Sequence, residues 1–524
     1  MYDEQPPPVS DVDARLAAAM TRAQSGSPNE AGADARAVLD ELGPEPSYTR
    51  AKAEYVRAVA AHHAGDADGV LEAVDSCIEI SRAIGEPGWE ANATAMRIVT
   101  QIRSGRGGDS VADLVAAEHA LGRTKDLALA GWAHTGLGYA YDLLRLFELC
   151  VPHFEQAIRI HVDPLGLSES PAIDRLNLAE SNLRWANEME RLGDPSYDDE
   201  IRERRQAAHR WAGEALEVAL SEGASEYWQL SGRVWLAASD ETAGPEAAAA
   251  VLQDCRDRLT KLGEFELVAI SGAYLAHACA ELGRLADARA AAERAVDDLP
   301  PLVDPPVEAM VRHIAVQIAA DSGEPGAEAG LQYARAIARG WWAERLRGLY
   351  AVRSALSAHE LAMRHDAEWR AAREDPLTGV GNRRALDERL AEAAASGRPV
   401  AVVLIDVDRL KNVNDSHGHA SGDHLLRAVA DLVAAQVRTD DVVARAGGDE
   451  FVVVLDNPGE RGAIELMDRV RYAAAALAAT ADSPWSAGLR VSLGHAATTE
   501  GTPVPDLLAV ADKRMYADKP ARPS

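Results

Sequence analysis

Two glycines and two acids stand in a row within residues 445–455, RAGGDEFVVVL. Adjacent glycines allow a tight turn and let another molecule approach the backbone. The neighbouring carboxylates of Asp449 and Glu450 repel each other unless a positive group lies between them. The apolar, β-branched run that follows has the length of a strand. The pattern predicts a hairpin tip that presents acids beside a gap made by Gly447 and Gly448; the alternative is an ordinary turn with solvated acids.

A second pair of acids ends another predicted strand, residues 399–408, PVAVVLIDVD. Side chains alternate between the faces of a strand, so Asp406 and Asp408 lie on one side. If the strand after the glycine turn pairs beside this one, Asp449 and Glu450 come near Asp406. Converging carboxylates need cations, and oxygen ligands suit Mg²⁺, which substrate phosphates complete. This favours a nucleoside triphosphate as the ligand; the alternative is a cluster of solvated acids at strand ends.

The segment 411–423, KNVNDSHGHASGD, is predicted to be a polar loop. Its Asn414 and Asp423 can read the edge of a guanine, because the amide meets the acceptors and the carboxylate accepts from the N1 and N2 hydrogens. Adenine would leave the Asp poorly paired, which is costly in a closed site. Taken alone, the segment is better interpreted as a solvated loop.

The elements that must position these residues alternate between strand and helix. Strands are expected at 399–408, 441–445, 450–455 and 489–497, and helices at 422–433, 464–477 and 505–519. Pro505 is well placed at the first position of the last helix. The pattern predicts an α+β domain with a mainly antiparallel central sheet over residues 375–524.

Residues 1–340 have a different character, rich in Ala, Leu and Arg with helical periodicity and no strand pattern. Residues 133–160 and 274–300, and more weakly 60–80, resemble the tetratricopeptide helix–turn–helix unit, which repeats about every 34 residues. Each such pair buries its face only by stacking on the next. We expect an all-α, tetratricopeptide-like solenoid that senses or binds a protein segment or a small ligand; a generic α-solenoid is the alternative.

Residues 341–374 form a predicted linker helix without proline. Apolar residues recur in it at a spacing of seven: Trp342, Leu349, Leu356 and Met363. Such a stripe is typical of a helix that pairs with a copy of itself, which makes a dimerising coiled coil the favoured interpretation. The alternative is a helix that packs back on the solenoid, since His359 and Asp366 interrupt the second row.

Composition narrows the class of protein. The formal net charge of -29 repels nucleic-acid phosphates and anionic membrane surfaces, so neither is an expected partner. None of the four cysteines stands in a CxxC spacing, and we expect them to be reduced and buried. The first residues lack a basic stretch followed by an apolar one, and no apolar run reaches the ~18 residues that span a bilayer. We expect a cytoplasmic protein.

The last 150 residues resemble the GGDEF domain of diguanylate cyclases. The matching pieces occur in order at 375–384 (DPLTGVGNRR), 406–411 (DVDRLK), 414–415, 418–419, 422–423, 447–451 (GGDEF), 492–494 (SLG), 511–512 and 516–519. The resemblance implies an enzyme that condenses two GTP molecules into cyclic di-GMP, a bacterial second messenger, and two pyrophosphates.

The resemblance also implies roles for single residues. The implied metal ligands are Asp406, the Val407 carbonyl, Asp449 and Glu450, with two Mg²⁺ or Mn²⁺ per active site, and the implied catalytic residues are Asp449, Glu450 and Asp406. Glu450 alternatively helps to activate the 3′-hydroxyl. The implied substrate-binding residues are Asn414 and Asp423 for the guanine, Lys411 and Lys519 for phosphates, and Gly447 and Gly448 for room against the backbone.

Each domain of this family holds one GTP, so two domains must face each other, which implies a homodimer and gives the linker helix a purpose. Arg438 and Asp441 match the RxxD inhibitory site for the product cyclic di-GMP; the alternative is a helix-end Arg and a strand-start Asp. Leu410 stands where the family usually has Phe. The residues after Lys519, PARPS, depart from the usual Gly-Arg-Asn, and Arg522 is the candidate replacement for its cation.

Three other functions stay open at this point. One is a catalytically silent module that binds cyclic di-GMP and relays it to a protein held by the solenoid. Another is a scaffold that carries the cyclase as a passenger. A cyclase acting on ATP is disfavoured by Asn414 and Asp423.

Overall fold

The computed structural model describes residues 11–24, 26–106, 110–162, 169–221, 224–240, 244–301, 303–458, 461–480, 483, 485–486 and 489–519. The chain divides into two compact units, residues 1–358 and 359–524, which are described separately below. Arg522 lies outside the described residues. Within the described part, none of the helices combines the length and the hydropathy that crossing a bilayer requires.

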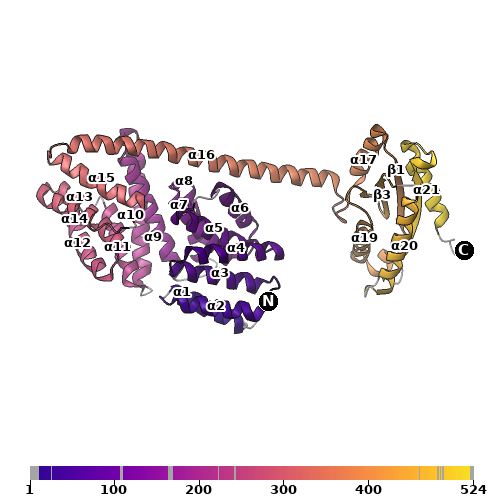
Figure 1. Ribbon diagram of the computed structural model, residues 1–524, viewed down its shortest axis with the longest axis horizontal. Helices are drawn as coiled ribbons and strands as arrows, with labels where there is room; N and C mark the ends of the chain where they lie inside the picture. Colours follow the sequence, from indigo (N-terminus) through magenta and orange to yellow (C-terminus); the bar gives the residue numbers. More distant parts are fainter. Residues whose placement is uncertain are drawn as a thin grey trace. The chain divides into compact units, whose positions relative to one another are not determined.

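The first unit is built from helices alone in its described part (Figure 1). Its elements before the last helix are α1 (Asp11–Gln24), α2 (Pro28–Leu42), α3 (Tyr48–His63), α4 (Ala67–Ile84), α5 (Pro87–Arg103), α6 (Ser110–Arg123), α7 (Leu127–Leu143), α8 (Phe147–Val162), α9 (Glu169–Glu190), η1 (Pro195–Tyr197), α10 (Asp198–Ser221), α11 (Glu226–Ser239), α12 (Pro245–Leu262), α13 (Phe265–Glu281), α14 (Leu285–Asp297) and α15 (Pro305–Asp321). Polar side chains such as those of Ser47, Asp66 and Asp126 cap helix N-termini by accepting backbone N–H groups. The predicted all-α architecture is confirmed.

The three repeat-like stretches are all helix–turn–helix pairs, namely α3–α4, α7–α8 and α13–α14. In α7–α8, a Cβ placed on Gly138 would come within 2.8 Å of the Phe154 ring, so the glycine allows the two helices to approach closely. In α13–α14, Gly283 makes the turn with a positive φ of 71°. These pairs are consistent with a helical-repeat domain, while its assignment to the tetratricopeptide class stays a prediction.

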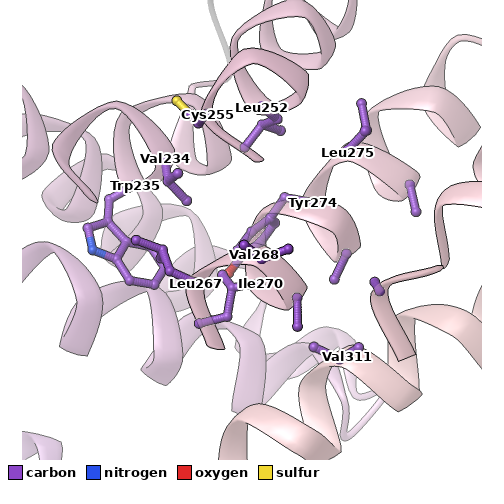
Figure 2. Packing of buried hydrophobic residues seen from close by; sticks show 14 of the residues in the cluster. Val234, Trp235, Leu252, Cys255, Leu267, Val268, Ile270, Tyr274, Leu275 and Val311 are labelled. Atoms are coloured by element: carbon purple, nitrogen blue, oxygen red, sulfur yellow. The ribbon is translucent and has the colours of Figure 1, made fainter. Parts of the chain in front are cut away.

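The largest core of this unit lies where α11, α12, α13 and α15 meet (Figure 2). Trp235 from α11, Cys255 from α12, Tyr274 from α13 and Val311 from α15 pack there. All four cysteines of the chain are free and buried, as predicted.

Helix α16 (Ala327–Arg373) contains nearly all of the predicted linker but begins earlier than residue 341. Trp342 and Leu349 are buried within the first unit, and Leu356 packs against the same core as Leu349. At Trp342, Leu349 and Leu356 the helix therefore packs back on the solenoid, which is the alternative interpretation of the stripe. Met363 is 38% exposed, and pairing of the helix beyond Ala358 with a second copy stays a prediction.

The second unit is an α+β domain, coloured orange to yellow in Figure 1. Its elements are α17 (Arg383–Ser396), β1 (Val400–Val407), α18 (Leu410–His417), α19 (His419–Ala434), β2 (Val442–Gly447), β3 (Glu450–Asp456), α20 (Gly462–Thr480), β4 (Val491–Ala497), η3 (Thr498–Glu500), η4 (Val504–Asp506) and α21 (Leu507–Asp518). The strands form one antiparallel sheet in the order β2-β3-β1-β4. The predicted fold class is confirmed.

Alternation along the strands gives the sheet two covered faces. Val400, Val402 and Leu404 of β1 share a core with α17 and α21. The residues between them, such as Val403 and Ile405, share the other core with α19 and α20. Asp406 continues the first series and therefore lies on the face of α17 and α21.

Two sequence-based expectations for this unit were wrong. The polar loop predicted at 411–423 is the helix α18, the turn at Gly418 and the start of α19. Val413 buries one side of α18 in the sheet core, and this tertiary packing outweighs the weak helical signal of a short polar segment. Pro505 lies in η4 rather than at the start of the last helix, which begins at Leu507.

Candidate active site

The acids of the two predicted groups meet at the end of β1. The antiparallel register pairs Asp406 with Glu450, and the Val407 N–H donates to the Asp449 carbonyl over 3.0 Å. Glu450 shares its side of β3 with Val452 and Val454, which belong to the same core as Leu404. The prediction that the hairpin strand brings Asp449 and Glu450 close to Asp406 is confirmed.

One cation lies among these acids. Lys519 Nζ donates to Asp406 Oδ2 over 2.8 Å, and Asp406 is only 6% exposed. The hydrogen bond to Asp406 raises the pKa of Lys519. The residue directly after α21 thus neutralises part of the charge at the carboxyl end of β1.

The remaining acids stay crowded. Burial, together with the charges of Asp406 and Asp449, raises the pKa of Glu450 above its ordinary value. Burial also raises the pKa of Asp408, although Ser492 Oγ donates to Asp408 Oδ1 over 2.9 Å and opposes the shift. Such mutual repulsion is relieved by a bound cation.

The donor set fits a hard divalent cation but does not enclose one. Asp406, Asp449, Glu450 and the Val407 carbonyl supply oxygen atoms alone, which is the preference of Mg²⁺. Within the described ranges, no three acidic, histidine or cysteine side chains form a ready metal cluster. A metal held here would therefore need further oxygen ligands from a substrate or water.

The glycine turn is open on its outer side and braced from within. Gly448 has a φ of +45°, the strand register shifts at Gly447, and a Cβ on either glycine would meet no atom within 4 Å. Arg445 Nη2 and Nε donate to the Gly448 carbonyl over 2.6 and 3.0 Å. Arg445 Nη1 donates to Asp375 Oδ1 over 3.1 Å. The sequence did not suggest this contact, although Arg445 lies in the segment 445–455 and Asp375 in the segment 375–384.

The two residues expected to hold guanine come from α18 and α19. A Cβ placed on Gly422 would overlap the Asn414 side chain, so Asn414 lies directly over Gly422, the residue that precedes Asp423. Among the described residues, no hydrogen bond or ion pair joins Asn414 or Asp423 to the carboxylates of β1 and β3. Lys411 is exposed on α18. The structure thus places Asn414 against Gly422, beside Asp423, while Lys411 is exposed to solvent.

Asp441 has a structural role within the proposed inhibitory motif. Its carboxylate accepts the backbone N–H of Arg438 over 2.9 Å and that of Asp456 over 3.1 Å. These bonds fix the entry to β2, as the alternative interpretation expects of a strand-start Asp. Arg438 is exposed. Product binding at this pair stays a prediction.

Helix α21 is seated on β4 by two residues whose roles sequence reasoning did not assign. A Cβ on Gly494 would overlap the backbone of Ala511 and Met515, so only glycine allows this approach. Asp518 Oδ2 accepts the Leu493 N–H over 2.9 Å. Both contacts position the end of α21, from which Lys519 reaches Asp406.

The match to a known protein family lies within this second unit. Residues 372–523 match the family described as "Diguanylate cyclase, GGDEF domain". These residues are a GGDEF domain. The geometry above is therefore that of the GGDEF turn, with Gly447 and Gly448 open to solvent and Asp449 and Glu450 beside Asp406.

Similar proteins include a diguanylate cyclase and a response regulator. Diguanylate cyclase DosC of Escherichia coli (strain K12) is 33% identical over 168 residues, which are 31% of this chain and 34% of DosC. Response regulator PleD of Caulobacter vibrioides (strain NA1000 / CB15N) is 36% identical over 151 residues, which are 28% of this chain and 33% of PleD. The chain thus spans about a third of the length of these relatives.

Among solved structures, the coiled coil and GGDEF domain of DgcB from Caulobacter crescentus in complex with c-di-GMP is 25% identical. The match covers 33% of this chain and 93% of that chain, with a TM-score of 0.29.

Proposed function

We propose that the protein is a diguanylate cyclase, which condenses two GTP molecules into cyclic di-GMP and releases two pyrophosphates. The observation that carries the proposal is the register of β1 and β3, which places Asp406 against Glu450 beside the open Gly447–Gly448 turn. The match of residues 372–523 to the GGDEF family supports the same activity.

In this proposal the carboxylates hold divalent metal and the turn admits the triphosphate. Asp406, Asp449, Glu450 and the Val407 carbonyl would hold two Mg²⁺ or Mn²⁺ ions, whose charge would polarise the α-phosphate and offset that of pyrophosphate. The 3′-oxygen of one GTP forms a bond to the α-phosphorus of the other, and the bond to pyrophosphate breaks. Alternatively to binding metal, Glu450 would accept the proton of that 3′-hydroxyl.

Other residues would fix the substrate in place. Asn414 and Asp423 hydrogen-bond the guanine edge, and this selects GTP over ATP. Lys411 and Lys519 meet the phosphates, for which Lys519 exchanges Asp406 for a phosphate oxygen. Because each domain would hold one GTP, the active species is a homodimer.

Regulation completes the proposal. The helical unit would control whether two GGDEF domains meet, and cyclic di-GMP would inhibit at Arg438 and Asp441. The silent cyclic di-GMP-binding module is the alternative that the same measurements must separate.

The test is turnover of GTP by the full-length chain in the presence of Mg²⁺, with the nucleotides separated and identified. Asp449→Ala is the inactive control, and Asp468→Ala, on the exposed side of α20, is the matched surface control. Cyclic di-GMP from the wild type and from Asp468→Ala, with none from Asp449→Ala, supports the enzyme. Binding of cyclic di-GMP without any turnover, at concentrations where the chain is dimeric, would favour the silent module.

A further inference from the structure

The helical unit contains a pocket of about 380 Å³ between α9, α10, α13 and α15. This volume lies in the range of small-molecule sites, which are about 300–1,000 Å³. One part of its lining is apolar, with Met310, Ile314 and Ile318 from α15 and Ala280 from α13. The pocket is therefore large enough for a compact organic molecule and can bury an apolar body.

A buried cation without a close partner lines this pocket. Only 9% of the Arg191 side chain is exposed, and its Nε atom is buried without a hydrogen-bond partner among the described residues. Its nearest acid is Glu188, at 3.9 Å between Nη2 and Oε1. Removing a charge from water without close pairing costs stability, so such a group needs a reason to persist.

The acids beside Arg191 already have other partners. Glu188 accepts two hydrogen bonds of 2.6 Å from Arg145. Glu190 forms an ion pair of 2.6 Å with Arg205. The ion pair of Arg191, at 3.9 Å, is thus longer than those of Arg145 and Arg205, which are both 2.6 Å.

His313 of α15 also lines this pocket. Burial, followed by the positive charges of Arg191 and Arg335, lowers the pKa of His313 to about 4. At neutral pH this histidine is uncharged and retains one N–H that can donate to a ligand.

We propose that this pocket binds a small monocarboxylate with an apolar body, whose carboxylate pairs with the Arg191 guanidinium. The planar fork of Arg matches a carboxylate with two parallel hydrogen bonds. A phosphate dianion is disfavoured, because Glu190, Glu281 and Asp321 also line the pocket and Arg205, the other guanidinium of the lining, already pairs with Glu190. This proposal concerns the helical unit and does not depend on the cyclase activity.

The test measures binding of straight-chain monocarboxylates, from hexanoate to dodecanoate, to the full-length chain by calorimetry, with their methyl esters as neutral probes. We expect the affinity to rise about fourfold for each added methylene until the pocket is filled. The esters should bind at least about tenfold more weakly than the acids, because they lack the charge-assisted pair.

Two variants separate a ligand-binding Arg191 from a structural one. Arg191→Met should abolish the preference for acids over esters while the thermal midpoint stays the same or rises, since an unpaired buried charge is removed. Ile314→Trp, which fills the pocket, should abolish binding of both probes. Arg312 pairs with Glu308 on the exposed side of α15. The variant Arg312→Met should therefore change neither the binding of the acids nor that of the esters.

The proposal is overturned if no carboxylate in the series binds the wild-type chain, or if acids and esters bind equally well. A fall in the thermal midpoint of Arg191→Met, together with unchanged carboxylate binding, would make Arg191 a structural cation and would equally overturn it.

Discussion

Lys519 Nζ lies 2.8 Å from Asp406 Oδ2, so the ammonium group occupies the carboxylate that is proposed to bind metal. The two cations compete for one acid. In the proposed reaction, metal and triphosphate must enter together, because the phosphate gives Lys519 a new partner as it leaves Asp406.

Lys519→Met should therefore have two opposite effects. The kcat/KM for GTP should fall about 10- to 100-fold, the size of a lost hydrogen bond between charged groups. The affinity for Mn²⁺ without nucleotide, measured by calorimetry, should rise because Asp406 is freed. Lys513→Met, an exposed lysine of the same helix, serves as the control. Weaker Mn²⁺ binding in Lys519→Met would refute the competition.

Gly422→Ala should act through Asn414. The added methyl group would overlap the Asn414 side chain and push it away from Asp423, so the KM for GTP should rise up to about tenfold. Asn414→Ala should give a similar rise, and the double variant should be no worse than either, because both changes remove one interaction. Steady-state kinetics check this, with the exposed His424→Ala as control. Additive effects would show that Gly422 does not position Asn414.

Gly494→Ala should destabilise the GGDEF domain. Its methyl group would overlap the backbone of Ala511 and Met515, and overpacking of this kind costs about 1–3 kcal/mol or more. Gly340→Ala is the matched change in an exposed stretch of α16, where a Cβ meets no atom within 4 Å, and should stabilise by about 0.5–1 kcal/mol. The thermal unfolding midpoints of both variants test these predictions. A Gly494→Ala variant as stable as the wild type would mean that α21 can shift on β4 without cost.

The pH dependence of stability should expose a histidine pair in the helical unit. His134 Nδ1 on α7 lies 2.9 Å from His153 Nδ1 on α8, and burial with the charge of His153 lowers the pKa of His134 to about 4. The folded state then binds a proton less readily than the unfolded state, whose pKa is about 6.5. Stability is therefore lost as the pH falls from about 6.5 to about 4.

His134→Gln removes this loss. Relative to the wild type, the variant should gain up to about 2 kcal/mol between pH 7.5 and pH 5 in urea unfolding. His365→Gln, whose side chain is 74% exposed, should show no such gain. Parallel pH profiles for His134→Gln and the wild type would contradict the prediction.

The strands and the meeting of the acids could be predicted from the sequence because alternation fixes which side chains share a face. Once the strand that begins at Glu450 is taken to pair with the one that ends near Asp408, the carboxylates of Asp406 and Glu450 lie on the same face of the sheet. The short hairpin fixes only the pairing of β2 with β3, and the pairing of β3 with β1 was a condition of the prediction that the structure meets.

The helix α18 and the contacts of Lys519 could not be predicted in this way. Six polar residues with Leu410 and a single buried Val413 give little periodicity, and the packing that holds them as a helix comes from distant parts of the chain. Lys519 and Asp406 are far apart in sequence, and their contact depends on how closely α21 approaches β4 at Gly494.

The seven-residue stripe of α16 shows a different limit. A row such as Trp342, Leu349 and Leu356 carries the same signal whether it faces a second chain or its own solenoid. Only the structure separates the two, and it places these side chains in the core of the first unit.

That placement determines where the chain can be divided. A fragment ending at residue 340 would lose Trp342, Leu349 and Val352 from its interior and expose the surfaces that they cover, so we expect it to aggregate. A fragment beginning at residue 341 would expose the same three side chains to water. Separation after Ala358 leaves both interiors whole, which makes that point of α16 the natural boundary for replacing the helical unit by another domain.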